Sequence, residues 1–276
     1  MRLRFWGTRG SIASSGPETV RYGGDTASIE VITGEGRLVV LDAGSGIRQL
    51  GNHIELSHDR VDILLSHLHM DHVQGLPFFR PLLDPHVETH IWGPVSTTQD
   101  LRYHISRYLS PPLFPVRVRD LPNVSFHDVP PSTFEISSLS VRADLITHPG
   151  TTLGYRIEED GKAIAYLSDH EPALGRGKIP DEPEWTSGYG LATGADVLIH
   201  DAQYNEEEYA RRVGWGHTSI SQLGAFTRMT DPGHLITFHH DPAHSDTELD
   251  VLHEELGGLV NGTRVSAGVP ELTIEV

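Results

Sequence analysis

The chain has 276 residues, and its 38 acidic and 21 basic side chains give a formal net charge of −17, together with 18 histidines and no cysteine. This length suffices for a sizeable hydrophobic core, and the lack of cysteine excludes a disulfide framework, a thiolate nucleophile, a zinc ribbon and an iron–sulfur site. The acidic balance argues against a protein that coats nucleic acid with a basic face.

Short β-rich runs separated by turn residues indicate an α/β protein. The expected strands, in chain order, are Arg2–Trp6, Ser28–Ile32, Leu38–Leu41, Asp62–Leu65, Thr89–Trp92, Leu139–Ile146, Leu153–Ile157, Ala163–Leu167, Val197–Ile199 and Leu235–Phe238. The first strands follow one another through short loops, as in a meander. The later strands are separated by helical stretches, as in crossover units.

Three helices are expected, over Thr98–Tyr108, Ser219–Arg228 and Asp246–Leu256. A proline-rich stretch follows the first of them and predicts a loop or lid element around 96–118. Because the chain shows no flexible linker, we expect one domain over 1–276. No apolar run is long enough for a signal peptide or a membrane span, which predicts a cytoplasmic protein.

The histidines carry the strongest functional signal. His67, His69, Asp71 and His72 lie within six positions, directly after the apolar run Val61–Leu65. Alternate residues of an extended chain point the same way, so His67 and His69 can hold one metal ion. Asp71 and His72 can face a second ion. The alternative is an exposed histidine-rich loop, but the end of a strand is where α/β proteins place their chemistry.

The same rule finds three further candidates, His148, Asp169 and His239, each of which ends an expected strand. Alone, each residue is consistent with an ordinary turn or cap. Taken with the first motif, they supply closing imidazoles and a carboxylate that can bind both ions, for which Asp169 is the natural choice. His240 competes with His239, which we prefer because it continues the phase of its strand.

These residues resemble the metallo-β-lactamase fold superfamily, whose H-x-H-x-D-H signature corresponds to His67, His69, Asp71 and His72. Leu41-Asp42-Ala-Gly44 is similar to the early Asp-x-Gly turn of that superfamily. The resemblance implies an α/β, four-layer αβ/βα sandwich and a hydrolase with two divalent metal ions. Zinc fits the nitrogen and oxygen ligands best, and manganese is the alternative.

Two further motifs are similar to those of the nuclease and phosphodiesterase branch. They are Ile199-His-Asp-Ala-Gln203, in which Asp201 replaces a glutamate, and Gly216-His217-Thr-Ser219. The resemblance implies that Asp201 orients His217, and that His217 acts as a general acid. The alternative for His217 is an ordinary residue at the start of a helix.

Two segments near the start of the chain, Phe5-Trp-Gly-Thr-Arg-Gly-Ser11 and Tyr22-Gly-Gly-Asp-Thr26, resemble those of proteins related to the tRNA 3′-processing nuclease and to cyclic-phosphate and cyclic-nucleotide phosphodiesterases. By analogy with this branch, a homodimer is also expected.

The resemblance predicts a two-metal phosphodiesterase with Asp71, Asp201 and His217 as catalytic residues. A hydroxide held between the ions attacks phosphorus, while His217 protonates the leaving oxygen and Asp201 holds its tautomer. The expected ligands are His67, His69 and His148 for one ion, Asp71, His72 and His239 for the other, and Asp169 as the bridge.

A small phosphodiester, above all a cyclic nucleotide, is the expected substrate. No lysine- or arginine-rich arm is evident, and a charge of −17 would repel a long polyanion, so a long nucleic acid and a membrane are not expected as partners. Tyr108 and Phe114 are candidates to stack on a base and Arg9 to contact a phosphate, although packing roles are the alternative for all three.

Three other functions stay open at this point. They are a tRNA 3′-processing endonuclease, a thioester or lactone hydrolase, and a metal- or ligand-binding module without turnover.

Overall fold

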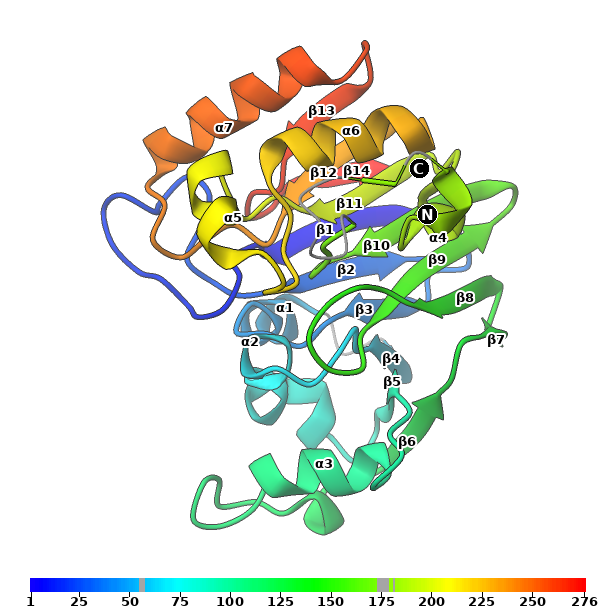
Figure 1. The fold of residues 1–276 in the computed structure, drawn as a ribbon. Helices are drawn as coiled ribbons and strands as arrows, with labels where there is room; N and C mark the ends of the chain where they lie inside the picture. Colours follow the sequence, from blue (N-terminus) through cyan, green and yellow to red (C-terminus); the bar gives the residue numbers. More distant parts are fainter. Residues whose placement is uncertain (55–57, 173–178, 181) are drawn as a thin grey trace.

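In a computed structural model, which describes residues 1–54, 58–172, 179–180 and 182–276, two seven-stranded sheets pack face to face between helices (Figure 1). The first sheet has the strand order β14 (Thr273–Glu275), β1 (Arg2–Gly7), β2 (Ser28–Ile32), β3 (Leu38–Leu41), β4 (Arg60–Leu64), β5 (Glu88–Pro94) and β6 (Val124–Val129). The second has the order β13 (Arg264–Ala267), β12 (His234–Phe238), β11 (Val197–Asp201), β10 (Lys162–Leu167), β9 (Leu153–Glu159), β8 (Leu139–Leu145) and β7 (Ser132–Ile136).

Helices cover the outer face of each sheet. The first sheet is covered by α1 (Ile47–His53), α2 (Met70–Val73) and α3 (Leu101–Tyr108). The second sheet is covered by α4 (Tyr189–Ala192), α6 (Ile220–Thr230) and α7 (Asp246–Leu259), and α5 (Glu206–Arg212) lies beside them (Figure 1). Short 3-10 turns lie at Leu76–Phe78, Arg80–Leu83, Val118–Asp120 and Pro183–Trp185. The predicted four-layer αβ/βα sandwich is confirmed.

Strands that are buried on both faces produce this layering. In β3, Val39 and Leu41 belong to the core between the sheets, whereas Leu38 and Val40 pack under the helices of the first sheet. Because successive side chains of a strand point to opposite faces, one apolar run contributes to two layers. The second sheet uses the same alternation against α4, α6 and α7.

The functional edge of the sandwich is set by strand direction. Strands β3 to β6 are parallel, and so are β10 to β13, so the carboxyl ends within each group share an edge. Hydrogen bonds join the two sheets there. The Tyr166 hydroxyl donates to the Asp42 carboxylate at 2.7 Å, and the Tyr155 hydroxyl donates to the Leu65 carbonyl at 2.7 Å.

All ten predicted strands are confirmed within two residues at each end. The four strands that the prediction missed, β6, β7, β13 and β14, are the edges of the two sheets. Edge strands are half solvated, so they lack the continuous apolar run that marked the central ones.

The three predicted helices are also confirmed, with shifted ends. Helix α3 begins at Leu101 and not at Thr98, because the Asp100 side chain accepts a hydrogen bond from the Tyr103 amide at 2.7 Å and caps it. The shorter helices α1, α2, α4 and α5 were not predicted.

The single domain with a lid around 96–118 stays a prediction. Within the described residues, no helix combines the length and apolarity that crossing a bilayer requires.

The packing of α7 generates a stability prediction. Leu256 is fully buried under the second sheet, whereas Val251 on the same helix is 60% exposed. We expect Leu256→Ala to lower the free energy of unfolding by about 3 kcal/mol, because it leaves a cavity, and Val251→Ala to change it by less than about 0.5 kcal/mol. Urea unfolding measures both. Equal effects would contradict the packing described.

Candidate metal centre

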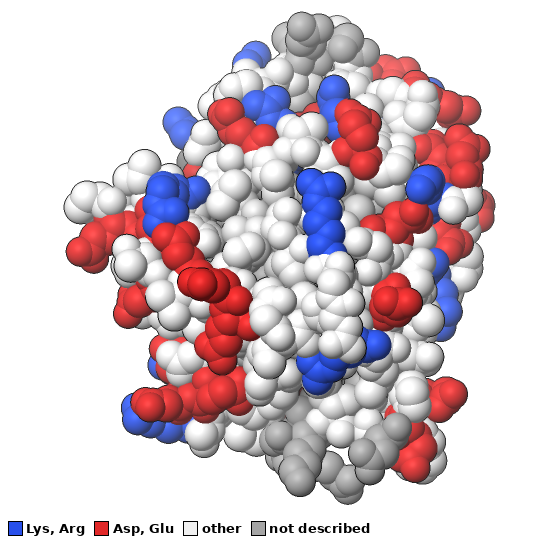
Figure 2. Space-filling model, turned by 90° about the horizontal axis from the view of Figure 1, so that it is seen from above, with Lys and Arg blue, Asp and Glu red and all other residues white. Residues whose placement is uncertain are grey.

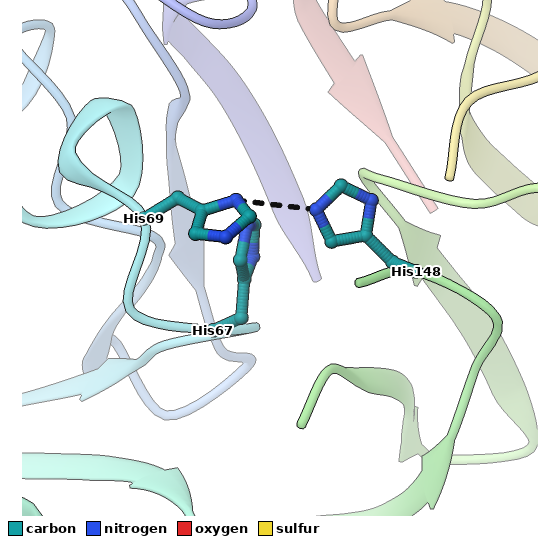
Figure 3. Close-up of side chains that lie close together, drawn as sticks. All are labelled: His67, His69 and His148. Atoms are coloured by element: carbon teal, nitrogen blue, oxygen red, sulfur yellow. Dashed lines mark hydrogen bonds between the residues drawn. The ribbon is translucent and has the colours of Figure 1, made fainter. Parts of the chain in front are cut away.

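Three histidines converge at the end of β4 and β8. His67 and His69 follow β4, and His148 follows β8 (Figure 3). His148 Nε2 lies 3.2 Å from His69 Nδ1, and one ring nitrogen of each of the three lies within 4.8 Å of the others. His67 and His148 are buried, whereas His69 is exposed. The group thus has one side open to solvent.

A second group lies beside the first and combines Asp71 and His72 of α2 with Asp169 and His239. His72 Nε2 lies 3.2 Å from Asp71 Oδ2 and 3.1 Å from Asp169 Oδ1. His239 Nε2 lies 3.2 Å from Asp71 Oδ2 and 3.3 Å from Asp169 Oδ2. All four residues are buried.

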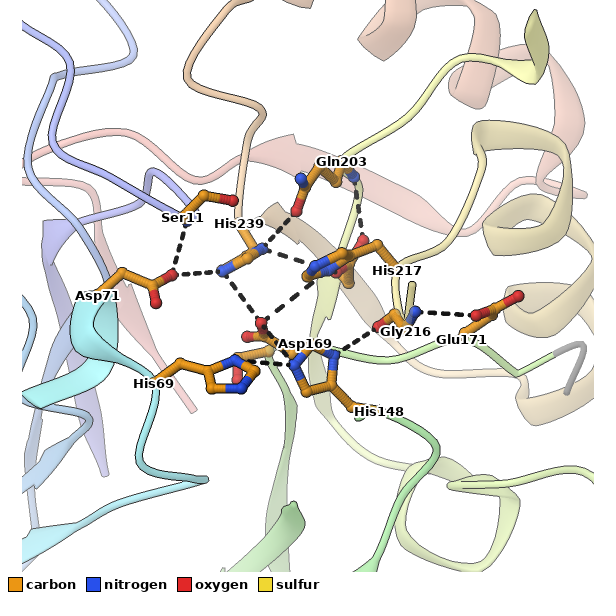
Figure 4. Close-up of polar contacts among 12 residues, drawn as sticks. Ser11, His69, Asp71, His148, Asp169, Glu171, Gln203, Gly216, His217 and His239 are labelled. Carbon is orange, nitrogen blue, oxygen red and sulfur yellow. Dashed lines mark hydrogen bonds and ion pairs between the residues drawn. The ribbon is translucent and has the colours of Figure 1, made fainter. Parts of the chain in front are cut away.

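The Asp169 carboxylate lies between the two groups (Figure 4). Its Oδ2 atom is 3.8 Å from His67 Nε2 and 3.7 Å from His148 Nε2, while its Oδ1 atom faces His72. Strand β10 holds this residue at the shared edge of the second sheet. The position is the one that a bridging carboxylate needs.

Unpartnered atoms test whether these residues fit metal ions. His67 Nε2, His72 Nε2 and Asp169 Oδ1 are buried and accept or donate no hydrogen bond among the described residues. Each such atom would cost about 1–3 kcal/mol if it stayed unsatisfied. All three face the cluster, so divalent cations would satisfy them together. Nitrogen and oxygen donors without sulfur suit zinc or manganese.

The protonation states favour the same interpretation. Burial lowers the pKa of His67 well below its ordinary value, so the imidazole is a neutral donor. Although burial opposes its charge, the neighbouring His239 and His72 hold the pKa of Asp169 well below its ordinary value. The Asp169 carboxylate in turn raises the pKa of His72 and His239 against their burial, so a bound cation would replace the protons of these two rings, whereas His67 and Asp169 already offer a lone pair and a negative charge.

The outer nitrogen of each buried histidine has its own partner. His72 Nδ1 donates to Asp42 at 2.7 Å, His239 Nδ1 to Gln203 Oε1 at 2.9 Å, His148 Nδ1 to the Gly216 carbonyl at 3.0 Å, and His67 Nδ1 to Ser66 Oγ at 3.1 Å. A proton on Nδ1 leaves the Nε2 lone pair directed into the cluster. The scaffold thereby selects the tautomer that binds metal.

Asp42 connects this layer across the sheets. Its buried carboxylate accepts hydrogen bonds from the Ser66 amide at 2.7 Å, the Ser66 hydroxyl at 2.8 Å and the Tyr166 hydroxyl, in addition to the His72 ring. One aspartate therefore links β3, the loop after β4, helix α2 and β10. The sequence marked Asp42 as part of a turn motif, but not its contact with Tyr166.

A histidine–carboxylate pair lies next to the cluster. His217 Nδ1 donates to Asp201 Oδ2 at 2.7 Å, and Asp201 also accepts from the amides of Gln203 at 3.0 Å and Thr218 at 3.1 Å. The His217 ring stacks on the His239 ring with centroids 5.0 Å apart. The two residues that the sequence motifs suggested as a pair are therefore in contact.

Glu171 is a buried residue of the site that the sequence did not indicate. Its carboxylate accepts a hydrogen bond from the Gly216 amide at 2.9 Å (Figure 4), and it also accepts from the Gly214 amide at 3.0 Å and the Tyr209 hydroxyl at 2.7 Å. Gly216 has a φ of 89°, and a Cβ there would lie 2.3 Å from His148 Nδ1. Glu171 thus holds the short loop that both supports His148 and carries His217.

Not every predicted site residue joins the cluster. Arg9 is fully buried, and its guanidinium donates to the carbonyls of Gly23, Asp241 and His244 at 2.8, 2.9 and 2.8 Å. This placement agrees with the packing role that the sequence left as the alternative, because Nε and one terminal nitrogen of Arg9 hold loops together, and its contact with a phosphate stays a prediction.

Three other candidates lie outside the cluster: His240, Tyr108 and Phe114. His240 Nε2 donates to the Gly268 carbonyl at 3.1 Å, away from the cluster, and His239 is the residue that lies within it. Tyr108 borders a cavity beside the site, whereas Phe114 packs edge-on against Phe78.

Comparisons with known proteins agree with this geometry. The family model described as "Beta-lactamase superfamily domain" matches residues 37–240. A Ribonuclease Z of Porphyromonas gingivalis is 26% identical over 267 residues, covering 80% of this chain and 85% of that protein.

Two solved structures share the fold. The metallo-beta-lactamase fold protein YhfI from Bacillus subtilis has a TM-score of 0.73 at 16% identity, covering 100% of this chain and 98% of the other. The short form of human tRNase Z has a TM-score of 0.70 at 19% identity, covering 100% and 99%. At such identities these structures show the fold alone.

The relatives correct one expectation. The sequence argued that a long nucleic acid is not a partner, but a relative matched over most of the chain is a ribonuclease, which acts on RNA. The expectation was wrong because net charge is a property of the whole surface, whereas a polyanion meets only the surface around the site.

The role of Asp42 generates a prediction about metal affinity. We expect Asp42→Asn to weaken zinc binding by about 10- to 100-fold, because the amide nitrogen cannot accept from His72 and leaves its tautomer unfixed. Competition with a chromophoric chelator measures this affinity. Asp62, a second buried aspartate, pairs with Arg60 outside the cluster, so Asp62→Asn should leave it unchanged.

The role of Glu171 generates a second prediction. We expect Glu171→Gln to lower kcat for a phosphodiester by about tenfold at unchanged KM, since a weaker acceptor loosens the loop that carries His217. Glu207→Gln, on the exposed first turn of α5, is the matched control. A loss confined to the unfolding midpoint, with kcat unchanged, would show that Glu171 acts on stability alone.

Proposed function

Since the chain belongs to the β-lactamase superfamily and is a metal-dependent hydrolase, we propose that it is a phosphodiesterase that cleaves RNA, as a ribonuclease Z does. The observation that carries the proposal is the hydrogen-bonded pair of His217 and Asp201 beside the metal-ligand cluster. Hydrolysis of an RNA diester expels an alkoxide, which needs a proton. Hydrolysis of a thioester expels a thiolate, which leaves without one. The names of the relatives support RNA over a cyclic nucleotide.

The two clusters supply the places for metal ions. His67, His69 and His148 would hold one ion, Asp71, His72 and His239 the other, and Asp169 both. When bound, two divalent cations supply Lewis acidity toward the phosphate oxygens and acidify a water molecule. The open side at His69 gives the substrate access.

The protein's own groups handle the proton. With Nδ1 of His217 donating to Asp201, the imidazolium form carries its transferable proton on Nε2. Two backbone amides keep Asp201 in place as an acceptor, so the ring cannot turn. His217 protonates the leaving oxygen, and Asp201 stabilises the charged ring before transfer.

Several narrower expectations stay predictions. They are the choice of zinc over manganese, the small phosphodiester and above all a cyclic nucleotide as the substrate, and the homodimer. The thioester or lactone hydrolase and the module without turnover are the competing functions that an activity screen must separate.

The screen uses zinc- and manganese-loaded protein with a tRNA precursor, 2′,3′- and 3′,5′-cyclic nucleotides, bis-p-nitrophenyl phosphate and a thioester. We expect cleavage of the precursor and its loss on chelation. Hydrolysis of the thioester alone, or of no diester, would overturn the proposal.

The proton-transfer role of His217 generates a sharper prediction. We expect His217→Ala to lower kcat on RNA by about 100- to 10,000-fold, because its leaving alkoxide requires a general acid. The loss on bis-p-nitrophenyl phosphate should be far smaller, since p-nitrophenolate leaves without a proton. His53→Ala, on the exposed end of α1, serves as the control. Equal losses on both substrates would assign His217 to structure or metal binding.

A further inference from the structure

Residues 101–119, which we term the α3 lobe, differ in charge from the rest of the chain. The lobe consists of α3 and the loop after it, and it contains four arginines and no aspartate or glutamate, although the whole chain carries −17. Arg102, Arg107 and Arg117 are exposed. Across the described ranges, no ion pair within 4.0 Å is found for these three, whereas Arg119 pairs with Asp120 at 3.7 Å.

The placement of the lobe sets it apart from the acidic surface. In Figure 1 it projects at the lower end of the molecule, beyond β5 and β6. Figure 2 shows the opposite end, over α6 and α7, where acidic side chains gather along the margins and basic ones stand singly. The unpaired positive charge of the lobe is therefore a local feature that the net charge conceals.

Two neighbouring cavities lie beside the lobe and the metal-ligand cluster. The larger cavity has a volume of about 490 Å³ and is lined by Leu68, Met70, Val73, His104, Ile105, Arg107, Tyr108 and Leu113. The smaller cavity of about 240 Å³ shares Leu68 and His104 with it and is lined by His67 and His69. The two shared residues place the larger cavity next to the one that His67 and His69 line.

The lining indicates the kind of ligand. Met70 and Leu113 are 51% and 70% exposed, which is unusual apolar exposure for side chains beside a cavity. The Tyr108 hydroxyl donates to the Gln74 carbonyl at 2.8 Å, which fixes the aromatic ring at the wall. Arg107 stands at the rim as a planar cation suited to a phosphate. An apolar planar body joined to an anion fits this combination, and a nucleotide has both.

We propose that the α3 lobe binds the RNA next to the scissile bond, with one nucleobase in the cavity against Tyr108 and Leu113 and an adjoining phosphate on Arg107. This subsite rests on the proposed function. Stacking and apolar contact are tolerant of sequence, so the lobe accepts different bases and adds affinity without strong base preference. The arginine adds a contact that salt weakens.

The test measures binding of a fluorescein-labelled single-stranded RNA by fluorescence anisotropy over a range of salt concentrations. The zinc-loaded protein carries His217→Ala throughout, so that cleavage does not consume the probe. We expect Arg107→Ala to raise Kd by about tenfold and to reduce the slope of log Kd against log salt by about 1. We expect Leu113→Ser to raise Kd by about fivefold with an unchanged slope.

Arg264→Ala is the matched control, because it removes an equal, exposed charge from β13 in the other sheet and should change neither quantity. Urea midpoints report whether each variant folds. Unchanged RNA binding in Arg107→Ala and Leu113→Ser would overturn the subsite. Binding to phosphatidylserine vesicles is measured as well. If Arg107→Ala loses vesicle binding while it keeps RNA binding, the subsite for RNA is also overturned.

A different pattern would separate this subsite from the proposed function. If the protein without the His217 change hydrolyses bis-p-nitrophenyl phosphate but no RNA, while both lobe variants weaken RNA binding, the proposed function fails. The placement next to a scissile bond then fails with it, and the lobe remains an RNA-binding surface. If RNA is cleaved and the lobe variants bind it normally, the subsite fails and the proposed function stands.

Discussion

Negative charge buried between the two sheets is the constraint on which the rest of this structure depends. Asp42, Asp71, Asp169 and Asp201 are each at most 5% exposed, and in the described part of the chain their ion-pair partners are histidines and not lysine or arginine. Buried carboxylates without cationic partners are costly, so the fold must supply either protons or metal ions. The orphaned nitrogen and oxygen atoms at the cluster show where metal ions would compensate that charge.

The arrangement explains why the surrounding residues matter as much as the ligands. Each buried imidazole is turned by a partner behind it, and those partners belong to other strands and loops, as with Gln203 for His239 and Gly216 for His148. Glu171 extends the same support to the loop of Gly216 and His217, so one loop contacts His148 and carries His217. A site built in this way is organised before substrate arrives, which is the condition for electrostatic catalysis.

Much of the fold and of the cluster was predictable, for identifiable physical reasons. Central strands such as Leu38–Leu41 carry apolar side chains on both faces and are visible as apolar runs, while the half-solvated edge strands are not. The motif from His67 to His72 is local, so its spacing alone indicated two groups. The burial of Arg9 was not visible in the sequence because it depends on residues more than 200 positions away, and net charge misled because it averages over the whole surface.

By itself, the sequence indicated which histidines and aspartates group together and that most of them follow a strand closely, because both are local properties of the chain. Only the tertiary structure decided that Asp169 lies between the two groups, that Asp42 joins the sheets through Tyr166, and that Glu171 supports Gly216. The physical reason is distance along the chain. Asp42 and Tyr166 are 124 positions apart, and they meet only because two separately formed sheets stack with their functional edges aligned.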